Sequence, residues 1–138
     1  MLSVVQSFNE KLKFFRNEET FKSLYSNNVQ FETSVWDLKM VFGEIDQSKG
    51  QDAVVQHSGV TVGWAEAKIF GYFLLVNLVL HQAREGQIHI PSSVLPPRPD
   101  PTSDTLDGEG KKIVEYAAWL HDEFFTNIHS NPPSNAKE

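Results

Sequence analysis

The chain has no cysteine among its 138 residues. This absence excludes disulfides, thiolate nucleophiles and cysteine-based zinc or iron–sulfur sites, and it is compatible with a cytoplasmic location. Positive charge is also scarce, because 12 Lys and Arg face 18 Asp and Glu and the formal net charge is -6. A nucleic-acid-binding surface needs clustered cations that displace counterions. We therefore expect a cytoplasmic protein with no nucleic-acid partner.

The sequence also lacks the motifs that identify common enzyme families. It contains no GxSxG, no phosphate-binding P-loop and no dinucleotide-binding glycine pattern. The start of the chain has no basic segment followed by a long apolar core, so we expect no secretion signal. These absences predict a protein that is not an enzyme and has no cofactor.

What the chain does have is a strongly apolar segment from Trp64 to Leu80. Between Ile69 and Leu80 only Gly71 and Asn77 interrupt the apolar residues. A helix this apolar must be covered on nearly all sides, yet it is shorter than the about 20 apolar residues of a bilayer span. We predict a buried helix and no membrane span. Because three strands cannot cover so much apolar surface, we also predict a homo-oligomer, with a dimer favoured.

Alternation of apolar residues before this helix predicts a sheet. Large side chains occupy odd positions from Val29 and even positions from Trp36 onward, so a turn or bulge is expected at 34–37 between strands at 28–34 and 37–46. A third strand is expected at 52–62, with a kink or bulge in its polar centre at 56–59. Short turns between successive strands favour antiparallel pairing.

The fold class is therefore α+β, with an antiparallel sheet of three or more strands packed on a long buried helix and flanked by terminal helices. Length favours a single domain over 1–138. We expect an N-terminal helix at 1–23, a strand–strand–strand–helix core at 24–91, a Pro-rich loop at 92–110, a C-terminal helix at 111–129 and a tail at 130–138.

Small residues four apart suggest where two copies meet. Gly63, Ala67 and Gly71 would let another backbone approach closely. The alternative is that this end of the helix crosses its own sheet, with Gly63 still in the preceding turn. Apolar positions of the central and N-terminal helices complete the candidate interface. Its members are Gly63, Ala67, Gly71, Leu74, Leu78, Phe8, Leu12 and Phe15. The large indoles Trp36 and Trp64 are expected in the core or at an interface.

Histidines are the remaining candidates for chemistry. No two of the five have the i, i+4 spacing that puts two metal ligands on one helix face, so we predict no metal site. A small-ligand-binding protein or an enzyme using His57, His81 or His89 beside a carboxylate such as Asp37 remains one alternative function.

A set of short motifs resembles a family of small bacterial proteins catalogued as a domain of unknown function. The motifs are Tyr25-Ser26-Asn27, Trp36-Asp37-Leu38, Phe42-Gly43, Ala67-Lys68 with Asn77, and Gly86-Gln87-Ile88. The resemblance covers about residues 24–91 and implies a strand–strand–strand–helix core, with no assigned activity. The chain departs from the family pattern at Gly63-Trp64, where Ser/Thr-Pro is usual.

A more distant similarity connects the order of strands, helix and Ile88-x-Ile90-Pro91 to the export chaperone SecB, as a fold analogy. The leading hypothesis is a non-enzymatic, homo-oligomeric protein-interaction module. A SecB-like chaperone that binds unfolded or secretory clients is the other alternative.

Overall fold

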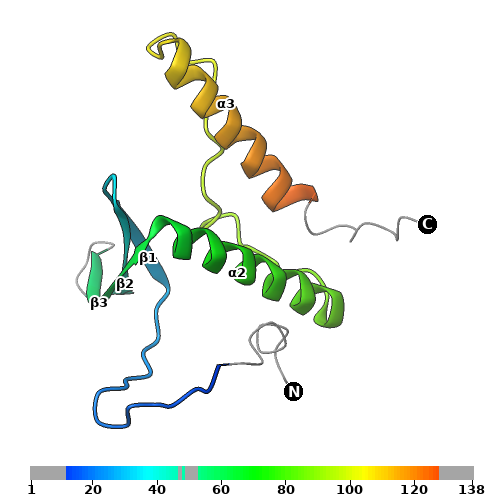
Figure 1. Cartoon of the computed structure of the whole chain (residues 1–138). Coiled ribbons are helices and arrows are strands. Elements are labelled where there is room, and N and C mark those ends of the chain that lie inside the picture. Colours follow the sequence, from blue (N-terminus) through cyan, green and yellow to red (C-terminus); the bar gives the residue numbers. More distant parts are fainter. Residues whose placement is uncertain (1–11, 47, 49–52, 128–138) are drawn as a thin grey trace, which may run out of the picture. The chain divides into compact units, whose positions relative to one another are not determined.

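The protein is represented by a computed structural model that describes residues 12–46, 48 and 53–127. The chain divides into two compact units, residues 1–74 and 75–138, and the boundary falls within one helix. The first unit holds the strands and the start of that helix, and the second holds the rest of the helix and the C-terminal elements (Figure 1). Each unit is described by itself.

Three strands form an antiparallel meander in the order β1-β2-β3. They are β1 (Asn28–Thr33), β2 (Asp37–Asp46) and β3 (Ala53–Gly63). The register pairs Phe31 with Met40 and Met40 with Val60. The antiparallel sheet, the change of parity at 34–36 and the α+β class were all predicted correctly. The turn arises because the Ser34 amide donates to the Asp37 carbonyl at 2.9 Å.

A β-bulge interrupts the pairing of β2 with β3. Phe42 lies opposite Ser58, but Gly43 lies opposite Gln56, so His57 is the extra residue of β3. The polar centre of this strand was predicted to kink or bulge, and the register confirms it. Because one extra residue reverses the parity of the strand, Val55 and Val60 face the same side of the sheet.

The helix α2 (Trp64–Glu85) follows β3 without a loop. It ends at Gly86, which adopts a left-handed φ of 95° and donates its amide to the Gln82 carbonyl at 3.0 Å. The predicted helix is therefore present, but the prediction that it is buried is wrong for this chain alone, because α2 has no buried residue. Its apolar side chains lack enough covering structure within the described chain.

Of the two predicted terminal helices, the C-terminal one is present and the N-terminal one is absent from the described residues. The helix α3 (Gly108–Asp122) begins after Asp107, whose carboxylate accepts from the Gly110 amide, and continues into a π-helical turn, η2 (Glu123–Asn127). The N-terminal helix is absent from residues 12–23, which form an irregular segment with one turn, and the remainder of that prediction lies outside the described residues. Along the described part of the chain, no helix is both long and apolar enough to cross a bilayer.

Candidate functional site

One side of the sheet is a continuous apolar surface, which we call the apolar sheet face. Where all three strands pair, the register places nine side chains on it, three from each strand. They are Val29, Phe31, Thr33, Leu38, Met40, Phe42, Ser58, Val60 and Val62. None of these nine is charged, but Glu44 and Asp46 lie on the same side of the sheet beyond the bulge, opposite Val55 and Ala53. Of the nine, those from the central strand are half-buried, but Phe31 is 56% exposed and Val60 47% exposed, so the face lacks a covering layer in the described chain.

The opposite side of the sheet is polar and its groups pair with one another. Lys39 Nζ lies 3.4 Å from Glu32 Oε2, and the Gln56 amide donates to Gln30 Oε1 at 2.8 Å. Val41, one of the few well-buried apolar residues, lies between these pairs. Such cross-strand pairs are typical of a solvated sheet surface. Where all three strands pair, the sheet is therefore amphipathic, and its apolar face is the side that a partner would cover.

The tip of the β1–β2 hairpin presents two large apolar side chains to solvent. Val35 is 85% exposed and Trp36 is 83% exposed. Their backbone is fixed, since Ser34 Oγ accepts from the amides of Trp36 and Asp37 and donates to the Asp37 carboxylate at 2.6 Å. Trp36 was predicted in the core or at an interface, and it is not in the core. A rigidly held, exposed Trp is the type of residue that anchors protein interfaces.

The start of α2 adds to the apolar surface of the same unit. The indole of Trp64 donates to the Ser34 carbonyl at 3.1 Å, which ties the helix start to the hairpin tip. The next exposed apolar residues are Ile69, Phe70, Tyr72 and Leu74. Mid-helix Gly71 lies in open space, because a Cβ built on it meets nothing within 4 Å. Packing within the described chain therefore does not explain a glycine there.

The motif Tyr25-Ser26-Asn27 forms a structural clasp across β2. Ser26 Oγ accepts from the Gly43 amide at 3.2 Å and lies 2.8 Å from the carbonyl oxygens of Asn28 and Gly43, to one of which its proton is donated. Asn27 Oδ1 accepts from the Ile45 amide at 2.8 Å. The side chains of the motif thus satisfy backbone groups of β2 where its pairing with β1 ends.

His57 takes part in the same clasp. Its Nε2 lies 2.8 Å from the Tyr25 carbonyl oxygen, which can only accept, so Nε2 carries the proton. In the neutral ring Nδ1 then accepts from Ser58 Oγ at 2.9 Å. Both ring nitrogens therefore form hydrogen bonds within the fold, so neither is available for proton transfer to a substrate. His57 is also the extra residue of the bulge in β3.

In the second unit, the segment after α2 is fastened to α3. Arg98 makes a bidentate pair with Asp122, with Nε–Oδ1 at 2.8 Å and a second nitrogen–oxygen contact at 3.0 Å. His121 Nε2 donates to the Pro96 carbonyl at 2.8 Å. The Pro-rich loop therefore has a defined course at 96–98. The hydrogen bond from Arg98 lowers the pKa of Asp122, and that from Asp122 raises the pKa of Arg98.

This pair gives a pH dependence with a definite sign. Because the folded-state pKa of Asp122 is below the ordinary 3.8, its stabilising contribution is complete above that value and disappears as pH falls through the lowered pKa. We expect hydrogen exchange in 94–98 to be unchanged from neutral pH to about 5 after correction for intrinsic rates, and to accelerate in stronger acid. The variant Asp122→Asn should remove this acid-dependent step, and its persistence there would contradict the assignment.

The predicted interface residues divide between the two units. Gly63 is the last residue of β3, so only Ala67 and Gly71 of the small-residue series lie on α2. Leu74 is 64% exposed, whereas Leu78 is half-buried in the second unit. Leu12 and Phe15 are 59% and 90% exposed in the irregular N-terminal segment, and Phe8 lies outside the described residues.

The remaining candidates for chemistry belong to different units of the chain. His81 and His89 are exposed residues of the second unit, while Asp37 is engaged by Ser34 in the hairpin turn. Within the part of the chain that the structure describes, no three His, Asp or Glu side chains are placed to hold a metal ion. The exposed hairpin tip is one feature that sequence reasoning missed. Two large apolar residues directly at a parity change are the signal that could have indicated it.

A family model described as "Protein of unknown function (DUF3467)" matches residues 5–90, which is more than half of the chain. The match includes the clasp, all three strands and α2. No curated protein and no solved structure matches the chain significantly.

Proposed function

The chain belongs to this family of proteins of unknown function, and from that premise we propose that it is a non-enzymatic, cytoplasmic protein-interaction module that works as a homodimer. The observation that carries the proposal is the apolar sheet face, which has no covering layer in the described chain. A second copy is a fitting occupant, because an isologous interface brings the same patch of both subunits together. The apolar parts of two such faces are complementary without any charge pairing.

A dimer interface of ordinary size would also need the surface of α2. Three strands of six residues, about 4.8 Å apart with a rise of about 3.3 Å per residue, cover roughly 300 Å² of projected surface. Even if side-chain relief doubles this area, it is below the about 800 Å² per partner of a stable interface. The exposed start of α2 and the hairpin tip, joined by the Trp64–Ser34 hydrogen bond, supply the additional apolar area.

The direct test is the mass of the native protein in solution. We expect sedimentation velocity and native mass spectrometry at micromolar concentration to give twice the 15.6 kDa of the chain. A monodisperse monomer across this range would overturn the proposal. A small-molecule adduct on a monomer would instead direct attention to ligand binding.

The substitution Gly71→Ala separates helix stability from association. Since a Cβ there meets nothing within 4 Å, the Ala variant of the isolated subunit should gain about 0.5–1 kcal/mol of unfolding free energy from helix propensity. In the dimer, the added methyl should hinder close approach of a second backbone and raise the dimer Kd about tenfold. The free energy is measured by urea denaturation and the Kd by sedimentation equilibrium. An unchanged Kd would exclude Gly71 from the interface.

A chaperone that binds extended clients is the second candidate. It is favoured by β1 and β3, each of which pairs with a neighbour along only one edge among the described strands. Extended segments can add to such an edge. Suppression of the aggregation of an unfolded model protein, by a chain that remains monomeric, would favour this function over homodimerisation.

A further inference from the structure

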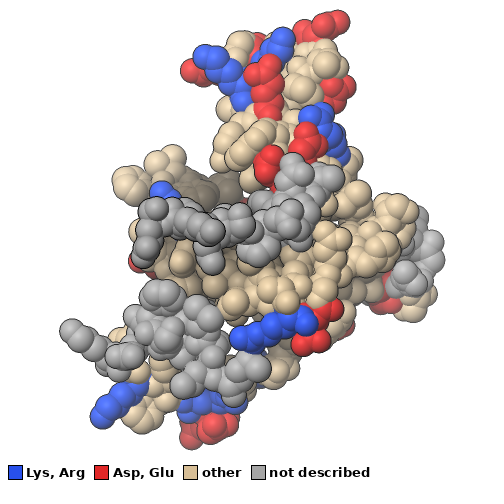
Figure 2. All heavy atoms as spheres, turned by 90° about the vertical axis from the view of Figure 1, so that its right-hand side faces the viewer, with Lys and Arg blue, Asp and Glu red and all other residues tan. Residues whose placement is uncertain are grey.

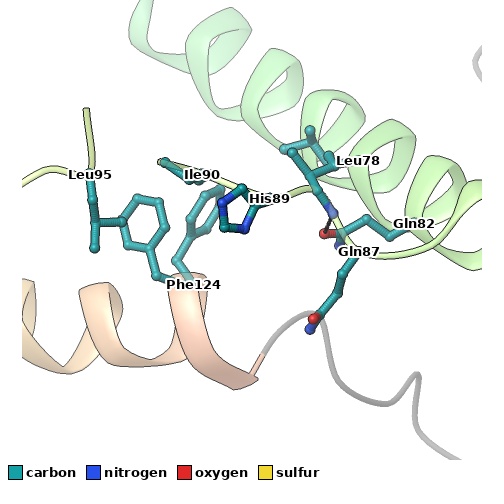
Figure 3. A pocket seen from close by; sticks show the side chains of 9 residues that line it. Leu78, Gln82, Gln87, His89, Ile90, Leu95 and Phe124 are labelled. Atoms are coloured by element: carbon teal, nitrogen blue, oxygen red, sulfur yellow. Dashed lines mark hydrogen bonds between the residues drawn. The ribbon is translucent and has the colours of Figure 1, made fainter. Parts of the chain in front are cut away.

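A cavity of about 510 Å³ lies within the second unit and is independent of the apolar sheet face. Its walls come from α2, from the segment that follows α2, and from η2. The nine residues that line it are Leu78, Gln82, Gln87, Ile88, His89, Ile90, Leu95, Phe124 and Phe125. Figure 3 shows Leu95, Ile90 and Phe124 toward one side, Leu78 and Gln82 toward the other, and His89 between them. The volume is in the range of small-molecule pockets.

Hydrogen bonds hold the walls of this cavity in place before any ligand arrives. Gln82 Oε1 accepts from the Ile88 amide at 3.1 Å, which fixes the chain directly after α2. Beyond Leu95, the His121–Pro96 and Arg98–Asp122 contacts attach the same segment to α3. A pocket with fixed walls loses little conformational entropy on binding.

Two consecutive aromatic rings of the π-helical turn line the cavity, those of Phe124 and Phe125. Their ring centroids are 5.2 Å apart in an edge-on arrangement. Single π-helical turns occur frequently at functional sites. Two Phe rings offer a further aromatic ring favourable stacking or edge contacts.

The lining determines the charge of a suitable ligand. None of the nine lining residues is Asp, Glu, Lys or Arg, so a charged ligand would lose hydration without gaining an opposite charge. Polar contacts come from His89 and Gln87. Within the described residues, neither ring nitrogen of His89 has a hydrogen-bond partner. On the side of the molecule drawn in Figure 2, charged side chains gather over α3.

We propose that this cavity is a binding site for a neutral aromatic small molecule of one or two rings that carries a single hydrogen-bonding group. The rings lie against Phe124 and Phe125 and the aliphatic residues of the opposite wall. The polar group of the ligand meets His89. The cavity accommodates about ten to twenty non-hydrogen atoms, which matches a bicyclic phenol.

The probe is 2-naphthol, observed by saturation-transfer NMR and titrated by calorimetry against the full chain. Its anionic analogue 2-naphthoate has nearly the same shape. We expect 2-naphthol to bind and 2-naphthoate to bind at least tenfold more weakly. Absence of 2-naphthol binding, or equal or tighter binding of the anion, would overturn the proposal.

Two adjacent residues provide matched variants. Leu95 lines the cavity, whereas neighbouring Val94 does not line it and is 64% exposed. Leu95→Trp should fill the cavity and weaken 2-naphthol binding at least tenfold, and Val94→Trp should leave it within twofold. His89→Ala should weaken binding, while His81→Ala, an exposed His on α2, should not. Circular dichroism establishes that each variant is folded. Equal affinities for the two Trp variants would contradict the site.

Discussion

Replacing Phe31 by Asp is expected to convert the proposed homodimer into a monomer. Phe31 lies on the apolar sheet face and is 56% exposed in the single chain, so the variant should fold normally. In the proposed dimer the same position would be buried, and the substitution would remove about 2 kcal/mol of apolar burial on each subunit. It also places a carboxylate in an interface that offers no cation, which costs several kcal/mol more. Together these effects predict at least a hundredfold increase in the dimer Kd.

The control for Phe31→Asp is a charge introduced on the same strand but on the opposite side of the sheet. Gln30 precedes Phe31 and faces the polar surface, where its side chain pairs with Gln56. Gln30→Asp should therefore leave the dimer Kd within about threefold, since exposed charges contribute little. Sedimentation equilibrium gives both constants, and circular dichroism establishes that the sheet is retained. If both variants dissociate equally, or neither does, the apolar sheet face is not the dimer interface.

The sequence predicted the sheet well because its signals are local. Alternation at Val29, Phe31 and Thr33, followed by the change of parity at Trp36, specifies which side chains share a face, whatever covers that face. The polar residues around His57 indicated the bulge, and Gly86 indicated the end of α2. In each case the residue type and the backbone geometry are linked within a few positions.

Burial could not be predicted in the same way, because it depends on what lies opposite. The apolar residues of α2 predicted a covered helix, yet no described residue of α2 is buried. The same limit applies at residues 12–23, where a helix was predicted and none is present. A short helix is only marginally stable in water unless its apolar side packs against other structure. The sequence therefore indicated that apolar surface exists, but not which molecule covers it.

The candidate site, too, could be predicted from the sequence only in part. The motif Tyr25-Ser26-Asn27 was recognised as a pattern, but its role as a clasp on Gly43 required the register of β2. The cavity of the second unit was missed because its walls combine α2, a Pro-rich segment and a π-helical turn. No periodicity connects elements so far apart in sequence. Ile88, Ile90 and Leu95 within a Pro-rich region were the available signal.

Replacing Gly43 by Ala is expected to destabilise the sheet more than any other small substitution discussed above. A Cβ at Gly43 would lie 2.7 Å from the Val55 carbonyl oxygen and 3.1 Å from the Gln56 Cα, both of them backbone atoms of β3. Neither atom can move without separating the two strands at the bulge. The same shift would disturb the Ser26 hydrogen bonds to Gly43. We expect a loss of about 3 kcal/mol of unfolding free energy, the upper range for an added methyl group in a packed region.

The matched control is Gly59→Ala in the same sheet. A Cβ at Gly59 would meet Lys39 Cε at 3.1 Å, and this atom lies near the end of a flexible side chain that can turn aside. We expect Gly59→Ala to change the free energy of unfolding by less than about 1 kcal/mol. Urea denaturation followed by far-ultraviolet circular dichroism measures both variants. Because Gly43→Ala acts on the fold, it should lower stability in the Phe31→Asp monomer as well, which distinguishes loss of the sheet from loss of association. Equal effects of the two glycine substitutions would show that backbone contact at Gly43 does not determine the stability of the sheet.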